Sequence, residues 1–104
     1  MRERIVDIAH SVHGVSVRLT HERWYHIVEN HDDLAGRFHD VLDAIETPTF
    51  VVRGNAGTLK AARNMARKKW LVVVYREVTR NDGFVITAYT LDGRPKGDIV
   101  WPRR

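Results

Sequence analysis

Hydrophobic and polar residues alternate along this chain with two different periods, which divide it into extended and helical segments. Residues 15–19 (Val-Ser-Val-Arg-Leu) alternate strictly, as a strand with one buried face does. Residues 3–9 hold a short apolar run, and the intervening His-Ser-Val-His-Gly favours a turn. The pattern predicts an N-terminal β-hairpin, with a short helix over residues 3–9 as the alternative.

Helical spacing begins directly after this hairpin. Trp24, Ile27 and Val28 recur so that they would share the buried side of a helix over residues 20–30. Thr20 precedes these residues and is the expected N-cap. The sequence therefore predicts an amphipathic helix that docks on a core.

A second stretch of helical spacing follows Asp33, which is its expected N-cap. This helix is predicted over residues 34–46, and Thr47-Pro48 would end it because the residue before a proline disfavours helical backbone. His39 falls on its polar side, where a plain surface histidine is expected. Its apolar positions are Leu34, Phe38, Val41, Leu42 and Ile45.

The rest of the chain has the pattern of successive strands separated by turns. Residues 70–78 form a continuous apolar, β-branched run, which is typical of a central strand covered on both faces. Residues 58–66 contain alanines that favour a helix, but their position between two turns favours the strand that we predict. The other predicted strands cover residues 49–53, 84–91 and 99–101. Together these elements predict an α+β fold, with the N-terminal β-hairpin and two helices packed on an antiparallel β-sheet.

Composition narrows the class of protein. The 104 residues fit a single domain, and 43% apolar with 29% charged residues is typical of a globular protein. The absence of cysteine excludes disulfides, thiolate nucleophiles and cysteine-type zinc sites, and it fits a reducing compartment. No apolar run approaches the ~18 residues of a membrane span, and Met-Arg-Glu-Arg is unlike a signal peptide. We therefore expect a cytoplasmic protein with no membrane partner.

Charge is distributed unevenly along the chain. Residues 1–47 carry five Lys/Arg and nine Asp/Glu, a net charge of −4, whereas residues 48–104 carry twelve and four, a net charge of +8. A basic C-terminal half indicates a polyanionic partner such as RNA, although basic residues also protect sheet edges. The expected RNA-binding residues are Lys68, Lys69, Arg76, Arg80, Arg94 and Lys96.

The first helix carries a polar stripe suited to phosphate chemistry. Arg23 and His26 are three residues apart, and Asn30 is four residues further on, so they lie along one side of the helix. A guanidinium holds an anion, and an imidazole moves a proton near neutral pH. The alternative is a solvated helix face without chemistry.

The histidines near the N-terminus give little support for a metal. His10 and His13 lie in the connection of the predicted hairpin and are interpreted as loop residues. Two histidines without a third ligand are weak grounds for a metal site. No metal or other cofactor is predicted.

Strict alternation in residues 84–91 would divide the side chains of that strand between two faces. Thr87 and Tyr89 would stand side by side, where hydroxyls can hydrogen-bond a phosphate, although both residue types are also favoured in strands for packing alone. Phe84, Ile86, Ala88 and Thr90 would point one way, and Val85, Thr87, Tyr89 and Leu91 the other.

Three stretches together resemble a known superfold. They are Leu19-Thr20-x-Glu22-Arg23-Trp24-x-His26-Ile27 followed by His31, then Leu71-Val-Val-Val-Tyr75, then Gly83-Phe-Val-Ile-Thr-Ala-Tyr89. Over residues 15–101 the chain resembles a phage-type branch of the barnase–EndoU–colicin–RelE-like ribonucleases. The resemblance implies a barnase/RelE-like fold and metal-independent RNA cleavage, often as a toxin with a cognate antitoxin or immunity protein.

The resemblance also implies roles for particular residues. Arg23 and His26 match the helix motif, His31 matches a histidine common after that helix, and Thr87 and Tyr89 match the strand motif. The expected function is endoribonuclease activity through 2′-hydroxyl attack, with these five residues as the catalytic set. The alternatives are a non-catalytic RNA-binding module and a structural partner protein.

Overall fold

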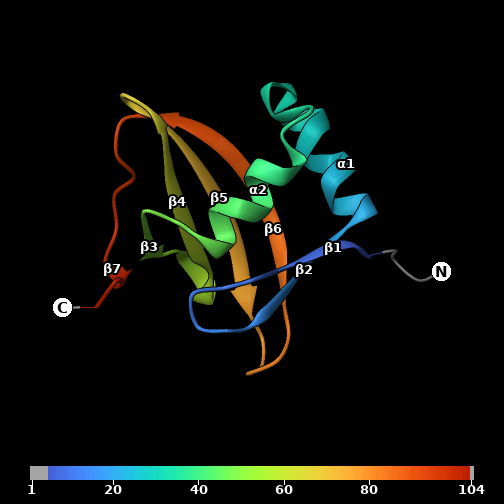
Figure 1. Ribbon diagram of the computed structural model, residues 1–104, viewed down its shortest axis with the longest axis vertical. Helices are drawn as coiled ribbons and strands as arrows, with labels where there is room; N and C mark the ends of the chain where they lie inside the picture. Colours follow the sequence, from blue (N-terminus) through green and yellow to red (C-terminus); the bar gives the residue numbers. More distant parts are fainter. Residues whose placement is uncertain (1–4, 104) are drawn as a thin grey trace.

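The strands of this protein form one seven-stranded sheet, and the two helices pack beside it (Figure 1). The computed structural model describes residues 5–103, with the side chain of Val6 left aside. The helices are α1 His21–Asn30 and α2 Phe38–Glu46, and short 3₁₀ helices cover Asp32–Leu34 and Asn55–Gly57. The strands are β1 Ile5–His10, β2 Ser16–Thr20, β3 Phe50–Arg53, β4 Leu59–Ala66, β5 Lys69–Glu77, β6 Gly83–Asp92 and β7 Ile99–Trp101.

The strand order β1-β2-β6-β5-β4-β3-β7 confirms the α+β class. β3 to β6 form an antiparallel meander, and β7 returns to pair with β3 at the far edge. The prediction of a purely antiparallel sheet is wrong at one place, since β2 and β6 are parallel. No tight turn dictates antiparallel pairing here, because both helices and three strands separate β2 from β6 along the chain.

The predicted N-terminal hairpin is present, but the predicted position of His10 in its loop is wrong. The β1–β2 hairpin is confirmed and the helical alternative is wrong over its described part, while residues 3 and 4 lie outside the described residues. His10 belongs to β1, where it pairs with Ser16, rather than to the loop.

The ambiguous segment 58–66 is a strand, because β4 is held between β3 and β5.

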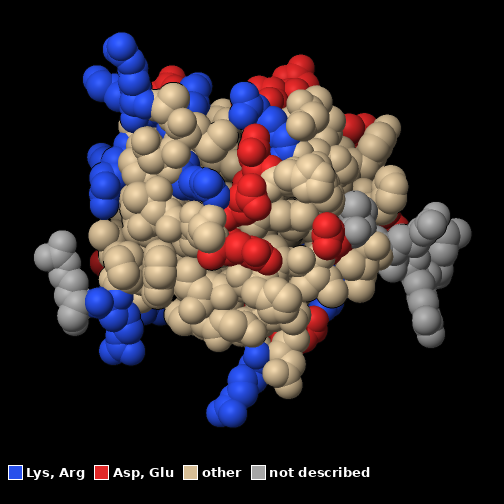
Figure 2. All heavy atoms as spheres, viewed as in Figure 1, with Lys and Arg blue, Asp and Glu red and all other residues tan. Residues whose placement is uncertain are grey.

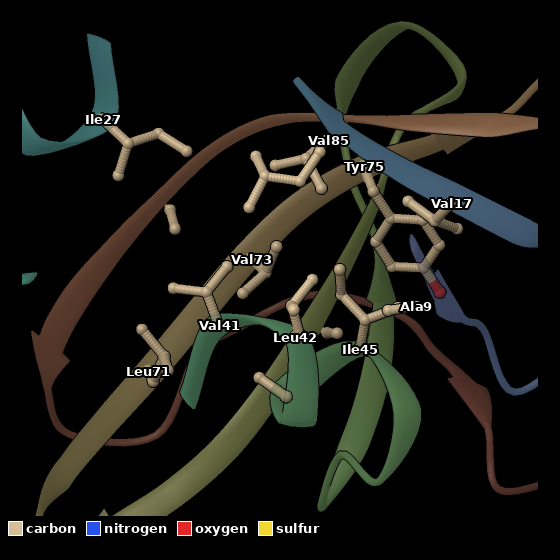
Figure 3. Close-up of a cluster of buried hydrophobic side chains, with 14 of the residues drawn as sticks. Ala9, Val17, Ile27, Val41, Leu42, Ile45, Leu71, Val73, Tyr75 and Val85 are labelled. Atoms are coloured by element: carbon tan, nitrogen blue, oxygen red, sulfur yellow. The ribbon is translucent and has the colours of Figure 1, made fainter. Parts of the chain in front are cut away.

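The main core lies between the helices and one face of the sheet (Figure 3). α2 contributes Val41 and Ile45, which are fully buried against the same cluster as Leu71 and Val73 of β5. Each such side chain contributes roughly 1.5–3 kcal/mol by leaving water. These buried contacts therefore fix the position of α2 on the sheet. Within residues 5–103, no helix is both long and apolar enough to cross a membrane.

The opposite face of the sheet has a small cluster of its own. Phe50, Val52, Ala62 and Trp70 are buried together there, and Gly97 of the β6–β7 connection lies against Val52. The guanidinium of Arg94 lies 4.2 Å from the centre of the Phe50 ring and 5.7 Å from that of Trp70. β5 is therefore buried on both faces, which confirms the prediction of a central strand.

α1 begins as the sequence predicts. The hydroxyl oxygen of Thr20 accepts a hydrogen bond from the backbone N–H of Arg23 at 3.1 Å, which makes Thr20 the N-cap. Ile27 is buried, and the half-buried Trp24 packs edge-to-face on Phe38 of α2, with ring centres 5.3 Å apart. These contacts hold α1 against α2 and the sheet.

α2 is shorter than predicted, and its predicted N-cap is wrong. Gly36 has a φ of +82°, a left-handed conformation that breaks the helical pattern, so α2 begins only at Phe38. Arg37 is the N-cap, and it provides no side-chain capping bond. The carboxylate of Asp33 instead accepts a hydrogen bond from the Thr90 hydroxyl at 2.7 Å, which ties the 3₁₀ helix to β6.

A β-bulge in β6 overturns part of the predicted alternation. Val85 pairs with Tyr75 and Thr87 pairs with Val74, so Ile86 is one extra residue between them. Because of this bulge, Val85 joins the main core together with Ala88, whereas the prediction placed them on opposite faces. Phe84 is likewise shifted, and it pairs with Arg76. Thr87 and Tyr89 follow the bulge and remain on one face, paired with Val74 and Val72.

We expect Gly83→Ala to lower the free energy of unfolding by about 1–3 kcal/mol, the range of overpacking in a filled site. A Cβ on Gly83 would collide with the carbonyl oxygen of Arg76, at the point where β6 begins its parallel pairing with Val17 of β2. Urea denaturation of both proteins measures the difference. An unchanged or higher stability would contradict the steric argument, since alanine also restricts the unfolded chain.

Candidate functional site

The predicted catalytic residues lie on α1, at its C-cap and on β6, and these two elements pack against each other. β2 pairs with β6 only through Val17 and Arg18, opposite Gly83 and Phe84. Beyond Phe84, within the described chain, the edge of β6 has no paired strand on that side and α1 lies there instead (Figure 1). A strip of surface therefore runs between the helix and the strand.

His31 and Tyr89 meet at one end of this strip. Their ring centres are 6.2 Å apart and the rings are inclined by 41°. His31 is the C-cap of α1, and its backbone N–H donates to the carbonyl of Ile27 at 2.8 Å. Thr87 precedes Tyr89 by two residues on the same face of β6, and both are partly exposed. Val72 and Val74, the partners of Tyr89 and Thr87, lie on the same face as Ala62 of the small cluster. Both hydroxyl-bearing side chains therefore leave β6 on the face opposite the main core, and Tyr89 reaches the His31 ring at the edge of the sheet.

Arg23 lies at the other end of the strip. It lines an open hollow of about 250 Å³ together with Arg18, Thr20, Phe84 and Val85. Arg18 is paired with the carboxylate of Asp82 and lies over the Phe84 ring. Arg23 is exposed and forms no ion pair with any residue in the 5–103 range. Its guanidinium is thus available to an anion.

His26 occupies the helix between these two ends and is exposed. Its backbone carbonyl accepts a hydrogen bond from the side-chain amide of Asn30 at 2.8 Å. Its imidazole forms no hydrogen bond, ion pair or ring contact with another described residue. Over α1 the rise from Arg23 to His31 is about 12 Å, and at about 100° per residue His26 and His31 project roughly 140° apart around the helix axis.

The six expected RNA-binding residues separate into groups. Lys68 and Lys69 stand where β4 turns into β5, and Arg94 and Lys96 belong to the β6–β7 connection, which a 2.6 Å hydrogen bond from Gly93 to Lys68 holds beside that turn. Lys69 forms an ion pair with Asp92 at 3.0 Å. Arg76 and Arg80 lie at or beyond the opposite end of β5.

Acidic side chains cover a different part of the molecule. In Figure 2, Asp and Glu side chains run down the middle of the face formed by α2, and Lys and Arg gather toward its left edge. Polyanions are repelled by such an acidic centre. On the face that Figure 2 shows, an anionic ligand is therefore favoured at the basic left edge and disfavoured at the acidic centre.

One polar network was not predicted from the sequence. The buried Ser11 hydroxyl donates to the carboxylate of Glu77 at 2.6 Å, and Nδ1 of His13 lies 3.0 Å from both oxygens of that carboxylate. Ser11 and Glu77 are 66 residues apart, so only the fold brings them together. The only signal in the sequence was His13 itself, which was interpreted as a plain loop residue.

Neither a metal cluster among the described residues nor a known relative identifies the site. Within residues 5–103, no three His, Asp or Glu side chains lie close enough together to hold a metal ion. The chain matches no protein-family model, no curated protein sequence and no solved structure.

Proposed function

We propose that this protein is a metal-independent endoribonuclease whose active site is the strip between α1 and β6. The observation that carries the proposal is the packing of α1 on β6, with the rings of His31 and Tyr89 6.2 Å apart. The α1 side of the strip offers the Arg23 guanidinium, which forms no ion pair with another described residue, and Tyr89 adds a hydroxyl beside His31. The resemblance of the Glu22–Ile27 and Thr87–Tyr89 motifs to barnase–EndoU–colicin–RelE-like ribonucleases agrees with it.

In the proposed reaction the RNA 2′-hydroxyl attacks the adjacent phosphorus atom, and the bond to the 5′-oxygen of the next nucleotide breaks. His26 takes the proton from the 2′-hydroxyl, and His31 or Tyr89 gives a proton to the leaving oxygen. Arg23 stabilises the charge that develops on the phosphate by paired hydrogen bonds. Thr87 lies on the face of β6 that points away from the main core, so no step is assigned to it. The products are a 2′,3′-cyclic phosphate and a 5′-hydroxyl.

A non-catalytic RNA-binding module is the second candidate, and one observation favours it. The imidazole of His26 has no described partner to orient it, whereas catalytic bases are commonly held by a hydrogen bond. Incubation with end-labelled RNA in EDTA separates the two functions. Cleavage to a cyclic phosphate supports the ribonuclease, binding without cleavage supports the module, and no affinity for RNA contradicts both.

RNA affinity is expected to fall steeply with salt, because each phosphate contact releases counterions. The double variant Lys68→Gln/Lys96→Gln should reduce the slope of log affinity against log salt by about 1–2. Both side chains are exposed and stand at the same end of the sheet. Fluorescence anisotropy of a labelled RNA at several salt concentrations measures the slope.

Arg37→Gln is a one-charge control at the same end of the sheet, because Arg37 lies near Lys69 but is already paired with Asp40. Its slope should equal that of the unaltered protein. If the double variant also keeps the full slope, the RNA lies away from this end of the sheet.

A further inference from the structure

An open cavity of about 660 Å³ lies at the opposite side of the fold from the α1–β6 strip. It forms where the β1–β2 turn meets the end of β3 and the C-terminal strand β7. Its lining residues are His13, Arg53, Ile99, Val100, Pro102 and Arg103. None of them belongs to the site proposed for RNA cleavage.

The polar side of this cavity is cationic. Arg53 and Arg103 are exposed, and neither forms an ion pair with another described residue. Arg53 is fixed through its backbone, because its N–H donates to the carbonyl of Asp98 at 2.9 Å and it pairs with Leu59. Two guanidinium groups without carboxylate partners around one hollow favour a ligand with at least one full negative charge.

His13 adds an oriented imidazole to the same cavity. Its Nδ1 lies 3.0 Å from both carboxylate oxygens of Glu77, and the carboxylate also accepts the hydroxyl of Ser11. The backbone N–H groups of His13 and Val15 both donate to the Ser11 oxygen at 3.2 Å, which fixes the turn. With Nδ1 engaged by Glu77, Nε2 is the ring nitrogen left for a ligand.

The remaining wall is apolar. Ile99 is 52% exposed, and Val100 and Pro102 continue this surface beside the cationic groups. A volume of about 660 Å³ falls in the range of small-molecule sites and far exceeds the needs of an inorganic anion. A phosphate group on the arginines would leave room for a flat, weakly polar group against this wall.

We infer that this cavity binds a nucleoside monophosphate, with the phosphate held by Arg53, Arg103 and Nε2 of His13 and the base against Ile99 and Pro102. Glu77 positions His13 and does not touch the ligand. The site is independent of the proposed ribonuclease, since it uses none of the residues of the α1–β6 strip.

Titration of the full chain with AMP, adenosine and inorganic phosphate, followed by calorimetry and by amide NMR shifts, tests the inference. AMP should bind with shifts at His13, Arg53 and Ile99–Arg103, inorganic phosphate at least about tenfold more weakly, and adenosine not measurably. Arg53→Gln should weaken AMP binding by about ten- to a hundredfold, as the loss of a charge-assisted hydrogen bond does. Arg37→Gln, with its charge beside α2, should bind AMP like the unaltered protein.

Three results would overturn the inference: no binding of AMP, shifts confined to α1 and β6, or equal loss of affinity in Arg53→Gln and Arg37→Gln. The second result would instead place nucleotides in the strip proposed for RNA cleavage. RNA cleavage by the Arg53→Gln variant separates the two proposals, because its rate depends on the strip and not on this cavity.

Discussion

Replacing His26 by alanine is expected to slow RNA cleavage by about 10²–10⁴-fold, the usual contribution of general acid–base assistance. RNA affinity should stay nearly unchanged, because an exposed imidazole on α1 contributes little to the hold on a polyanion whose phosphates meet several cations. The single-turnover rate in EDTA measures the first effect, and fluorescence anisotropy measures the second. Only a catalytic role separates the two quantities in this way.

His21→Ala is the matched control, since His21 is also an exposed histidine of α1 but begins the helix, outside the strip. It should keep the full rate. Arg23→Lys keeps the charge but loses the planar pair of donors, and it should also slow turnover. RNA methylated at the 2′-oxygen should bind and stay intact. Cleavage of that RNA, or equal losses of stability and rate in His26→Ala, would count against the mechanism.

Much of the fold could be predicted because the spacing of hydrophobic residues along the chain indicates most of its helices and strands. The spacing of Trp24 and Ile27 locates α1, Thr20 caps it, and the continuous apolar run of β5 marks the centre of the sheet. Even the ambiguous segment 58–66 followed from its place between two turns. Each of these patterns involves only residues close together in the sequence, so it can be recognised without knowledge of the tertiary structure.

The errors arise where a distant partner or a single backbone angle decides the outcome. Gly36 adopts a left-handed conformation that ends the apparent helix early, and an isolated glycine in a helical pattern is only a weak signal. The bulge at Ile86 exists only relative to β5, so the sequence of β6 alone suggests uninterrupted alternation. The parallel pairing of β2 with β6 joins residues more than sixty positions apart.

The candidate site also combines features that the local sequence predicts with features that depend on tertiary packing. The stripe of Arg23 and His26 is visible from helical spacing, but the contact of His31 with Tyr89 depends on how α1 docks on β6. The contact between His13 and Glu77 could not be predicted, because the sequence around a turn histidine does not indicate which distant residue it contacts. Local pattern therefore identifies the chemically useful side chains, and packing decides which of them meet.

Tyr75 should make the folded protein sensitive to alkali. Its side chain is fully buried, and its hydroxyl has no hydrogen-bond partner among the described residues. Burial, and secondarily the charge of Glu77, raise the pKa of Tyr75 far above its ordinary value of 10.0. The folded protein then keeps this proton when the unfolded chain releases it. Stability is therefore retained below pH 10 and falls above it, by about 1.4 kcal/mol per pH unit for this one group.

Tyr75→Phe removes both the ionisation and the unpaired hydroxyl. At neutral pH the variant should be at least as stable as the unaltered protein, because a buried hydroxyl without a partner costs about 1–3 kcal/mol. Above pH 10 its advantage should grow by about 1.4 kcal/mol per pH unit, so that urea denaturation at pH 10, 11 and 12 measures the difference directly. The two other tyrosines, Tyr25 and Tyr89, are common to both proteins and cancel in the comparison. A difference in stability that stays constant with pH would show that the Tyr75 hydroxyl ionises equally in the folded and the unfolded chain.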